Sequence, residues 1–284
     1  MKIGFAGLGV MGGPMARHLA SAGHQVAGYN RSPAKARAWA EAHGGRFAPT
    51  VADAASEAEL FTLCVGNDDD VRQVVGEALT VLKPGAVIVD HTTTSARIAR
   101  EMAAVADAKG VAFIDAPVSG GQAGAENGQL SVMAGGDAEA LEQVRPVLMA
   151  YSKAVQHMGP SGAGQLTKMV NQIAIAGVVQ GLAEAVHFAQ AAGLDTDRVY
   201  EAISKGAAQS WQMDNRWKTA AKGEFDFGFA VDWMRKDLGL ALDEARSNGS
   251  QLAVTALVDQ FYAEVQAMGG SRWDTSSLKA RLKA

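Results

Sequence analysis

Lys2-Ile3-Gly4-Phe5-Ala6-Gly7-Leu8-Gly9-Val10-Met11-Gly12 is the stretch that decides the fold of the first half of this chain. Residues 2–6 are typical of a short buried strand, and residues 15–22 predict a helix that Gly23 ends. A strand, a glycine-rich turn and a helix in this order predict a site for a dinucleotide pyrophosphate at the positive end of the helix, and the alternative is a merely tight turn. The first glycine permits the tight turn, the second lets backbone N–H groups approach the phosphates, and the third allows close helix packing. The candidate cofactor-binding residues are therefore Gly7, Leu8, Gly9, Val10, Met11 and Gly12.

Strands and helices continue to alternate after this turn. Further strands are expected, with helices between them, at residues 25–29, 60–65, 86–89, 111–114, 129–134 and 154–158. The glycines and proline of residues 159–162 mark a domain boundary. From residue 164 to 192 the pattern is helical and apolar, and a helix of about 43 Å suits a spine between two domains or two subunits. The prediction is an α/β Rossmann N-terminal domain, residues 1–162, followed by an all-α C-terminal domain, residues 163–284, joined by a long helix.

Size, charge and cysteine content exclude several classes of protein. A chain of 284 residues favours two domains. With 26 basic and 30 acidic residues and no block of like charge, neither a nucleic acid nor a membrane is an expected partner. Cys64, the single cysteine, is expected to be a buried strand thiol in a reducing compartment. No signal peptide is expected, because the N-terminal residues run into glycines without an uninterrupted apolar core. No membrane-spanning segment is expected either, because polar residues interrupt the long helix, so a cytoplasmic location is predicted.

The turn after the second strand bears on the choice between NAD and NADP. An NAD site carries Asp or Glu about twenty residues past the glycines, whereas this chain has Asn30 and Arg31. Arg31 can pair with a 2′-phosphate through its planar fork, and Asn30 can donate a hydrogen bond. The pair predicts NADP, with NAD still possible. The alternative is that Arg31 is a solvated cation before Ser32-Pro33, which is typical of a helix start.

Polar residues also follow the later strands, where the ligand of an open parallel sheet binds. Residues 67–70, Asn-Asp-Asp-Asp, are expected to cap a helix and complement its dipole, and no metal site is expected. The hydroxyl-rich residues 90–95 can meet a cofactor, although each hydroxyl can instead cap a helix. His91 is expected to be structural. The glycine-rich segment 115–125 predicts either a plain surface loop or one in which Ser119 and the glycines after it face an anion.

Lys168 and Asn171 lie three residues apart in the long helix, so both side chains project from one face. A dinucleotide site and a lysine at a domain join suggest hydride transfer assisted by a proton donor. Reduction of a carbonyl needs a hydride to carbon and a proton to oxygen, and oxidation of the alcohol needs the reverse. A lysine serves both directions when burial and the oxidised nicotinamide's charge bring its pKa from about 10.4 toward the working pH. On spacing alone, the alternative is a solvated helix lysine.

Four segments in order resemble the β-hydroxyacid dehydrogenase family, which includes 3-hydroxyisobutyrate dehydrogenase, tartronate semialdehyde reductase and glyoxylate/succinic semialdehyde reductases and is related to 6-phosphogluconate dehydrogenase. They are residues 7–16 (GLGVMGGPMA), 115–121 (DAPVSGG), 164–171 (GQLTKMVN) and 236–238 (KDL). The resemblance covers essentially the whole chain. It implies that Lys168 is the catalytic acid/base, that the substrate is a small carboxylate-bearing molecule, and that the protein is a homodimer or homotetramer. The implied substrate-binding residues are Ser119, Gly120, Gly121 and Asn171, and the implied cofactor-binding residues include Val65, Thr93 and Lys236.

Two positions depart from the family pattern. The family often has two asparagines after the lysine, whereas here Asn171 is followed by Gln172, which keeps an amide in the predicted substrate site on a longer arm. A changed substrate fit is therefore expected. The family often reads Asp-x-Ser-Thr where this chain has Asp-His-Thr-Thr at residues 90–93. Residues 211–217 match no signature of the family and either line a pocket rim or pack in the ordinary way.

The hypothesis from the sequence is an NADP-preferring oxidoreductase that interconverts a short β-hydroxyacid and its semialdehyde or oxoacid. One rival is an imine reductase on the same scaffold, for which Lys168 would be unnecessary because the iminium is already activated. The other rival is a non-catalytic dinucleotide-binding protein, which has little reason to keep Ser119, Lys168 and Asn171 together. A stripe of small residues on the long helix suits close packing of another helix: Ala174, Gly177, Gly181 and Ala185.

Overall fold

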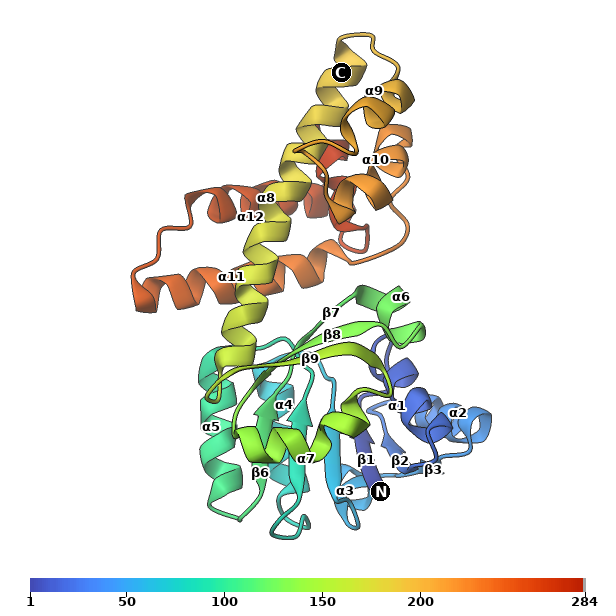
Figure 1. Cartoon of the computed structure of the whole chain (residues 1–284), viewed down its shortest axis with the longest axis vertical. Coiled ribbons are helices and arrows are strands. Elements are labelled where there is room, and N and C mark those ends of the chain that lie inside the picture. The colour runs from blue at the N-terminus through green and yellow to red at the C-terminus, as the bar shows by residue number, and fades with distance from the viewer. Residues whose placement is uncertain (283–284) are drawn as a thin grey trace. The chain divides into compact units, whose positions relative to one another are not determined.

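The computed structural model describes residues 1–282 and divides into two compact units, Met1–Lys168 and Met169–Ala284. The first is an α/β unit and the second is helical, as the sequence predicts (Figure 1). The long helix α8 (Ala163–Ala191) contains the dividing point. The predicted boundary between residues 162 and 163 stays a prediction.

Unit 1 is built on one sheet, which has nine strands within the described residues. The strand order is β3-β2-β1-β4-β5-β6-β8-β7, with β9 beside β8. The strands are β1 (Lys2–Ala6), β2 (Gln25–Tyr29), β3 (Arg46–Phe47), β4 (Leu60–Leu63), β5 (Val87–Asp90), β6 (Ala112–Asp115), β7 (Val118–Ser119), β8 (Leu130–Gly135) and β9 (Ser152–Gly159). Strands β1 to β6 are parallel, and β8 runs antiparallel to β6 and β7. The chain changes direction across the sheet between β1 and β4, where a doubly wound sheet binds its ligand.

Helices cover both faces of this sheet (Figure 1). They are α1 (Gly12–Ser21), α2 (Pro33–His43), α3 (Val51–Ala55), α4 (Asp68–Ala78), α5 (Ala96–Asp107), α6 (Gly121–Glu126) and α7 (Ala138–Leu148). Helices α1, α2 and α7 share a hydrophobic cluster with Phe5 and Val89, whereas α3, α4 and α5 share one with Ala6 and Ile88. Neighbouring residues of one strand thus enter opposite clusters because strand side chains alternate between faces.

Several details of the first unit differ from the sequence prediction, among them strand β3 and helix α3, which were not expected. Helix α1 begins at Gly12, before the predicted start at Met15. Glycines and a proline fill its first turn, so this turn was not recognisable as helical in the sequence. A proline is tolerated there because the N–H that it lacks would have no partner within the helix. Residues 115–125 do not form one loop: β7 pairs with β8, and α6 follows. Cys64 is half-buried and lies one residue beyond β4, so the prediction of a buried strand thiol is wrong.

Unit 2 is helical throughout its regular elements. Besides the rest of α8 it holds α9 (Thr196–Ile203), α10 (Trp211–Lys222), α11 (Val231–Asn248), α12 (Ala253–Ala267) and the 3₁₀ helix η1 (Thr275–Arg281). One face of α8 packs against α11 and α12 through a buried cluster that includes Ala176, Met234 and Tyr262. Trp217 is buried in a second cluster between α8 and α10, whereas Trp211 is exposed. For Trp217 the interpretation as ordinary packing is therefore confirmed.

Helix α8 is long and apolar enough to cross a membrane by length and composition, which the sequence analysis did not expect. A core helix of a folded domain passes the same test. Ala176, Val179, Ala183 and Val186 of α8 are buried in the two clusters of unit 2, as expected for such a core helix.

Candidate active site

The glycine turn lies at the carboxyl end of β1, beside the end of β4. The Gly7 N–H donates to the Tyr29 carbonyl (2.9 Å), and Gly7 has a φ of 96°, which favours glycine. A Cβ at Gly7 would overlap the Cys64 carbonyl oxygen, and a Cβ at Gly12 would overlap the Gly7 carbonyl oxygen. A Cβ at Gly9 would meet no atom of residues 1–282 within 4 Å. Gly7 and Gly12 therefore serve the fold, while Gly9 faces open space, as a cradle for a pyrophosphate requires. Of the remaining turn residues, Leu8 is buried, Met11 half-buried and Val10 exposed.

Asn30 fastens this turn to the one after β2. Its Oδ1 accepts a hydrogen bond from the Leu8 N–H (3.0 Å), and its Nδ2 donates to the Ser32 carbonyl (3.3 Å). A hydrogen bond from Asn30 to the cofactor stays a prediction. The structure adds a scaffold role, which a turn sequence alone does not reveal because Leu8 lies 22 residues away.

Arg31 projects into solvent near the start of α4. Its side chain is 90% exposed, and its guanidinium lies 3.8 Å from the Asp70 carboxylate. Asp70 in turn accepts the Gly66 N–H (3.1 Å). An exposed pair at this distance contributes little to stability, so a bound anion could compete with Asp70 for Arg31.

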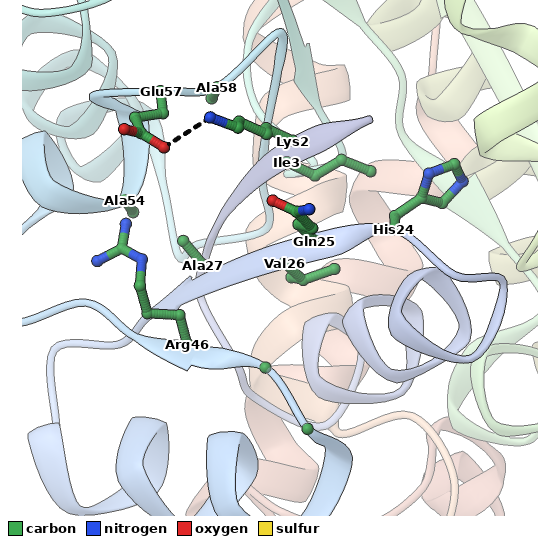
Figure 2. A pocket seen from close by; sticks show the side chains of 12 residues that line it. Lys2, Ile3, His24, Gln25, Val26, Ala27, Arg46, Ala54, Glu57 and Ala58 are labelled. Carbon is green, nitrogen blue, oxygen red and sulfur yellow. Dashed lines mark hydrogen bonds and ion pairs between the residues drawn. The ribbon is translucent and has the colours of Figure 1, made fainter.

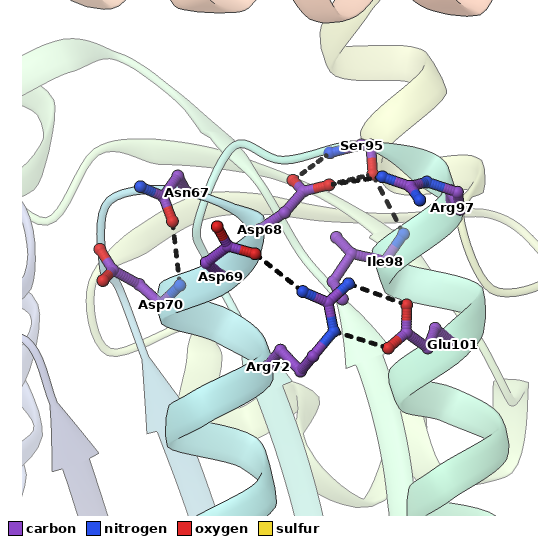
Figure 3. Close-up of polar contacts among 9 residues, drawn as sticks. All are labelled: Asn67, Asp68, Asp69, Asp70, Arg72, Ser95, Arg97, Ile98 and Glu101. Carbon is purple, nitrogen blue, oxygen red and sulfur yellow. Dashed lines mark hydrogen bonds and ion pairs between the residues drawn. The ribbon is translucent and has the colours of Figure 1, made fainter.

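The rest of the acidic run ties α4 to α5 (Figure 3). Asn67 caps α4 by accepting the Asp70 N–H (2.9 Å), which confirms its predicted role. Asp68 accepts both the backbone N–H and the hydroxyl of Ser95, the residue that caps α5. Arg72 binds Glu101 through two nitrogens and also contacts Asp69. These carboxylates are engaged in helix contacts, and no group of three potential metal ligands occurs in residues 1–282.

The turns after β4 and β5 are joined by Thr92. Its hydroxyl accepts the Val65 N–H (3.0 Å), and its own N–H donates to the buried Asp90 carboxylate (2.8 Å). Val65 and Thr93 are both half-buried beside this contact. The two residues thus lie at neighbouring strand ends, although a cofactor contact by either stays a prediction.

The first turn of α8 is held against unit 1 by two buried side chains that the sequence analysis did not single out. Asp115 Oδ1 accepts the Gly162 N–H (2.7 Å), and its Oδ2 accepts the Gln165 N–H (2.9 Å). The Gln165 amide donates to the Thr92 carbonyl (2.7 Å) and accepts the Thr94 N–H (3.0 Å). A carboxylate at a helix N-terminus meets unsatisfied N–H groups and the positive end of the dipole. In the sequence Asp115 is visible only as an aspartate at the end of a strand, because its partners lie about fifty residues further along the chain.

Burial of Asp115 predicts a pH effect on stability. Desolvation raises the pKa of this carboxyl to about 6, although the N–H groups of Gly162 and Gln165 act to lower it. Above the unfolded pKa of 3.8 and up to about pH 6, the folded state holds a proton that the unfolded chain has lost, so stability falls as pH rises. We expect the stability advantage of the wild type over Asp115→Asn to shrink by about 2 kcal/mol between pH 4 and pH 6.5. Urea unfolding at several pH values measures this difference. The exposed Asp107→Asn variant serves as control and should follow the wild type, and parallel curves for Asp115→Asn would contradict the prediction.

Lys168 is the last residue of unit 1, and its side chain is buried. Its Nζ donates to the Val118 carbonyl (2.9 Å), which directly precedes Ser119. The alternative of a solvated helix lysine is therefore wrong. Gly120 and Gly121 follow with positive φ values of 131° and 60° and are exposed, while Ser119 is half-buried. Within unit 1 the lysine and the predicted carboxylate-binding segment are thus neighbours.

The predicted site residues of unit 2 form a chain of polar contacts. Asn171 Nδ2 donates to Gln172 Oε1 (2.7 Å), and Gln172 Nε2 donates to Asp237 Oδ2 (2.7 Å). The Lys236 ammonium lies 3.3 Å from Asp237 Oδ1. Gln172 and Asp237 are both buried. Asp237 was visible in the sequence only as part of the Lys-Asp-Leu motif.

His91 is structural, as predicted. Its Nδ1 donates to the Ala116 carbonyl (2.6 Å), because a carbonyl only accepts, and its Nε2 then accepts from the Tyr151 hydroxyl (2.7 Å). Desolvation lowers the pKa of His91 to about 4. The histidine is therefore neutral at physiological pH and holds the end of β5 against β6.

A cavity lies at the opposite end of the sheet, beside the amino ends of β1 and β2 (Figure 2). It is lined by Lys2, His24, Arg46 and Glu57, among others, and Lys2 pairs with Glu57 (2.9 Å). Ligands of doubly wound sheets bind at the carboxyl ends of the strands. This cavity is therefore not the dinucleotide site.

A doubly wound sheet with its glycine turn at the switch point is the arrangement of a dinucleotide-binding protein. Residues 2–159 match the family described as the NAD binding domain of 6-phosphogluconate dehydrogenase. Residues 162–282 match that described as NAD-binding of NADP-dependent 3-hydroxyisobutyrate dehydrogenase. The chain belongs to the β-hydroxyacid dehydrogenase family and is an NAD(P)-dependent oxidoreductase.

Individual relatives agree with this assignment. The chain is 64% identical to an uncharacterized oxidoreductase of Shewanella frigidimarina over 285 residues, which cover 99% of this chain and 98% of the relative. Its structure is similar to that of Mycobacterium tuberculosis 3-hydroxyisobutyrate dehydrogenase with L-serine, at 33% identity, a TM-score of 0.92 and 99% coverage of both chains. It is also similar to Psf3 in complex with NADP+ and 2-OPP, at 26% identity and a TM-score of 0.88, with 99% of this chain and 100% of the other covered. The resemblance noted in the sequence is confirmed.

Proposed function

We propose that this protein is an NADP-preferring dehydrogenase that interconverts a short β-hydroxyacid and its semialdehyde or oxoacid, with Lys168 as general acid/base. The observation that carries the proposal is the burial of Lys168 with its Nζ on the Val118 carbonyl, next to Ser119. A buried lysine beside an anion-binding segment suits proton transfer to a carboxylate-bearing substrate.

Each part of the reaction has its residues. The bound dinucleotide supplies or accepts the hydride. Lys168 gives a proton to the carbonyl oxygen during reduction and takes one from the hydroxyl during oxidation. The Ser119 hydroxyl and the N–H groups of Gly120 and Gly121 hold the substrate carboxylate, since positive φ at both glycines turns the backbone tightly there. Asn171 holds the substrate by a hydrogen bond, and Gln172, next to it in the chain, is kept on this side of the proposed substrate site.

The cofactor site we propose extends from the glycine turn to the neighbouring strand ends. Asn30 and Arg31 would hold the ribose phosphate end of the cofactor, and Val65 and Thr93, which follow β4 and β5, would also contact it. Lys236 contributes from α11. The cradle at Gly9, open to at least 4 Å, supports a phosphate there.

A substrate panel tests the reaction. Short semialdehydes, glyoxylate and β-hydroxyacids should be turned over with NADPH or NADP+, and esters of the same acids should lose about 10²-fold or more in kcat/KM because the anion site is left unpaired. A cyclic imine is the comparison substrate. Turnover of the imine without turnover of any hydroxyacid or semialdehyde would contradict the proposal.

Arg31→Glu tests the cofactor preference. A carboxylate at this position repels a 2′-phosphate and accepts the ribose 2′-hydroxyl, so the ratio of kcat/KM for NADPH to that for NADH should fall by about 10²-fold. Arg198→Glu is a matched control, because Arg198 is 86% exposed and lies 3.9 Å from Asp195, much as Arg31 lies near Asp70. An unchanged ratio in Arg31→Glu would refute the 2′-phosphate contact.

We also keep the homodimer or homotetramer as a proposal. On α8, Ala174, Gly181 and Ala185 are exposed, together with the larger Val178 and Phe188. Added Cβ atoms at Gly177 and Gly181 would meet no other described residue within 4 Å. An exposed apolar face with small residues suits burial against a second copy.

A further inference from the structure

Gln172 occupies a position where both ends of its amide are engaged. The side chain is 2% exposed. Its Oε1 accepts from Asn171 Nδ2 at 2.7 Å, and its Nε2 donates to Asp237 Oδ2 at 2.7 Å. The Met234 sulfur lies 3.7 Å from the same Nε2. A buried amide with partners on both sides is held in one orientation, because turning it would place like groups against each other.

The orientation begins at Asp237. A carboxylate only accepts hydrogen bonds, so the amide nitrogen of Gln172 must face it and the amide oxygen must face away. That oxygen accepts a hydrogen bond from the Asn171 side chain, whose only donor is Nδ2. The direction of the Asn171 amide is thus set by a carboxylate two contacts away.

We propose that Gln172 is a positioning residue, which transmits the orientation set by Asp237 to the Asn171 amide and thereby sets the fit of the substrate. This role rests on the proposed function, in which Asn171 binds the substrate. The longer arm has a use here: glutamine carries one more methylene than asparagine, and its amide contacts both Asn171 and Asp237. The Lys236 ammonium lies 3.3 Å from the other oxygen of Asp237. The series of contacts from Asp237 through Gln172 to Asn171 therefore begins beside a proposed cofactor-binding residue.

The first test separates positioning from general stability. Gln172→Leu keeps the volume and removes both contacts, so KM for the hydroxyacid should rise about 10-fold or more while kcat changes less than about 3-fold, as for lost uniform binding. Asn171→Ala should raise KM similarly, and Gln172→Leu added to it should change KM less than about 2-fold, because contacting residues that act as a unit are not additive. Gln180→Leu is the matched control on α8, since Gln180 is also buried and bonds Glu184.

The second test exchanges the two groups. Gln172→Glu alone places two buried carboxylates in contact and should lower kcat/KM below that of Gln172→Leu. Adding Asp237→Asn should recover about 5-fold or more, because an asparagine amide can donate to the new glutamate, which still accepts from Asn171. The KM for NADPH is measured alongside, since Lys236 contacts Asp237.

The outcomes distinguish the two claims. A wild type that turns over no hydroxyacid or semialdehyde overturns the proposed function and, with it, this role. In an active wild type, additive effects of Asn171→Ala and Gln172→Leu overturn the role alone, as would a Gln180→Leu variant with the same rise in KM or a failed recovery in the exchanged pair.

Discussion

Replacing Lys168 by alanine is expected to lower hydroxyacid turnover by about 10²- to 10⁴-fold, the usual loss when a general acid/base is removed, while NADPH binding stays near that of the wild type. The reason is local: the lysine Nζ lies on the Val118 carbonyl beside Ser119, whereas the glycine turn is built from other residues. In the Lys168→Ala variant, residue 168 can no longer donate a proton, because the alanine side chain is only a methyl group. Steady-state kinetics and fluorescence titration with NADPH measure the two quantities separately.

Two additions make this result specific. A small primary amine in the buffer should restore part of the turnover of Lys168→Ala, because it can enter the vacated volume and carry the proton. Lys153→Ala, at an exposed position of β9, is the control and should keep wild-type kinetics. Unchanged turnover in Lys168→Ala would remove the lysine from the mechanism.

Gly9→Ala and Gly12→Ala are expected to fail in different ways. At Gly12 a methyl group would overlap the Gly7 carbonyl oxygen and press on the Phe5 ring, so the loss of stability should be at least the ~1–3 kcal/mol typical of overpacking. At Gly9 a methyl group meets no described atom within 4 Å and no positive φ is required. Gly9→Ala should therefore fold normally and bind NADPH at least about 10-fold more weakly, since the methyl group takes the space of the pyrophosphate.

Thermal unfolding and NADPH titration of both variants check this contrast. Gly76→Ala in α4 is the control, because Gly76 is exposed and its added Cβ meets nothing within 4 Å of the described residues. It should gain about 0.5–1 kcal/mol from helix propensity and bind NADPH as the wild type does. If Gly9→Ala binds NADPH normally, the open face of the turn is not the phosphate site.

The strand and glycine turn at residues 2–12 could be predicted because both signals are local. A short apolar run, in which residues 3–6 are all buried, and the glycine pattern after it leave little freedom, and β1 has the predicted bounds. Segment 115–125 was less predictable because its structure depends on a distant partner. Val118 pairs with Val132 of β8, and no local pattern in a glycine-rich stretch announces such a pairing.

The candidate site divides in the same way. Lys168 and Ser119 were found through motifs, although spacing alone left the lysine undecided between catalysis and solvent. Asp115 and Gln165 were missed because their importance lies in contacts across about fifty and seventy positions of chain. Buried side chains that satisfy backbone groups carry no residue-spacing signature, so only a folded structure shows them.

The hydrogen bonds of the Gln165 amide determine which residues of the loop after β5 can be exchanged without loosening α8. Both of its partners in the loop after β5 are main-chain atoms, the carbonyl of Thr92 and the N–H of Thr94. Mutations that exchange the Thr93 or Thr94 side chain leave those atoms in place. The side chains of Thr93 and Thr94 can thus change in evolution, or be randomised in a library for new cofactor or substrate preferences, while the first turn of α8, which carries Lys168, keeps its anchorage. The Ser-Thr pair that is frequent in the family and Thr92-Thr93 of this chain are two side-chain combinations at the same positions of this loop.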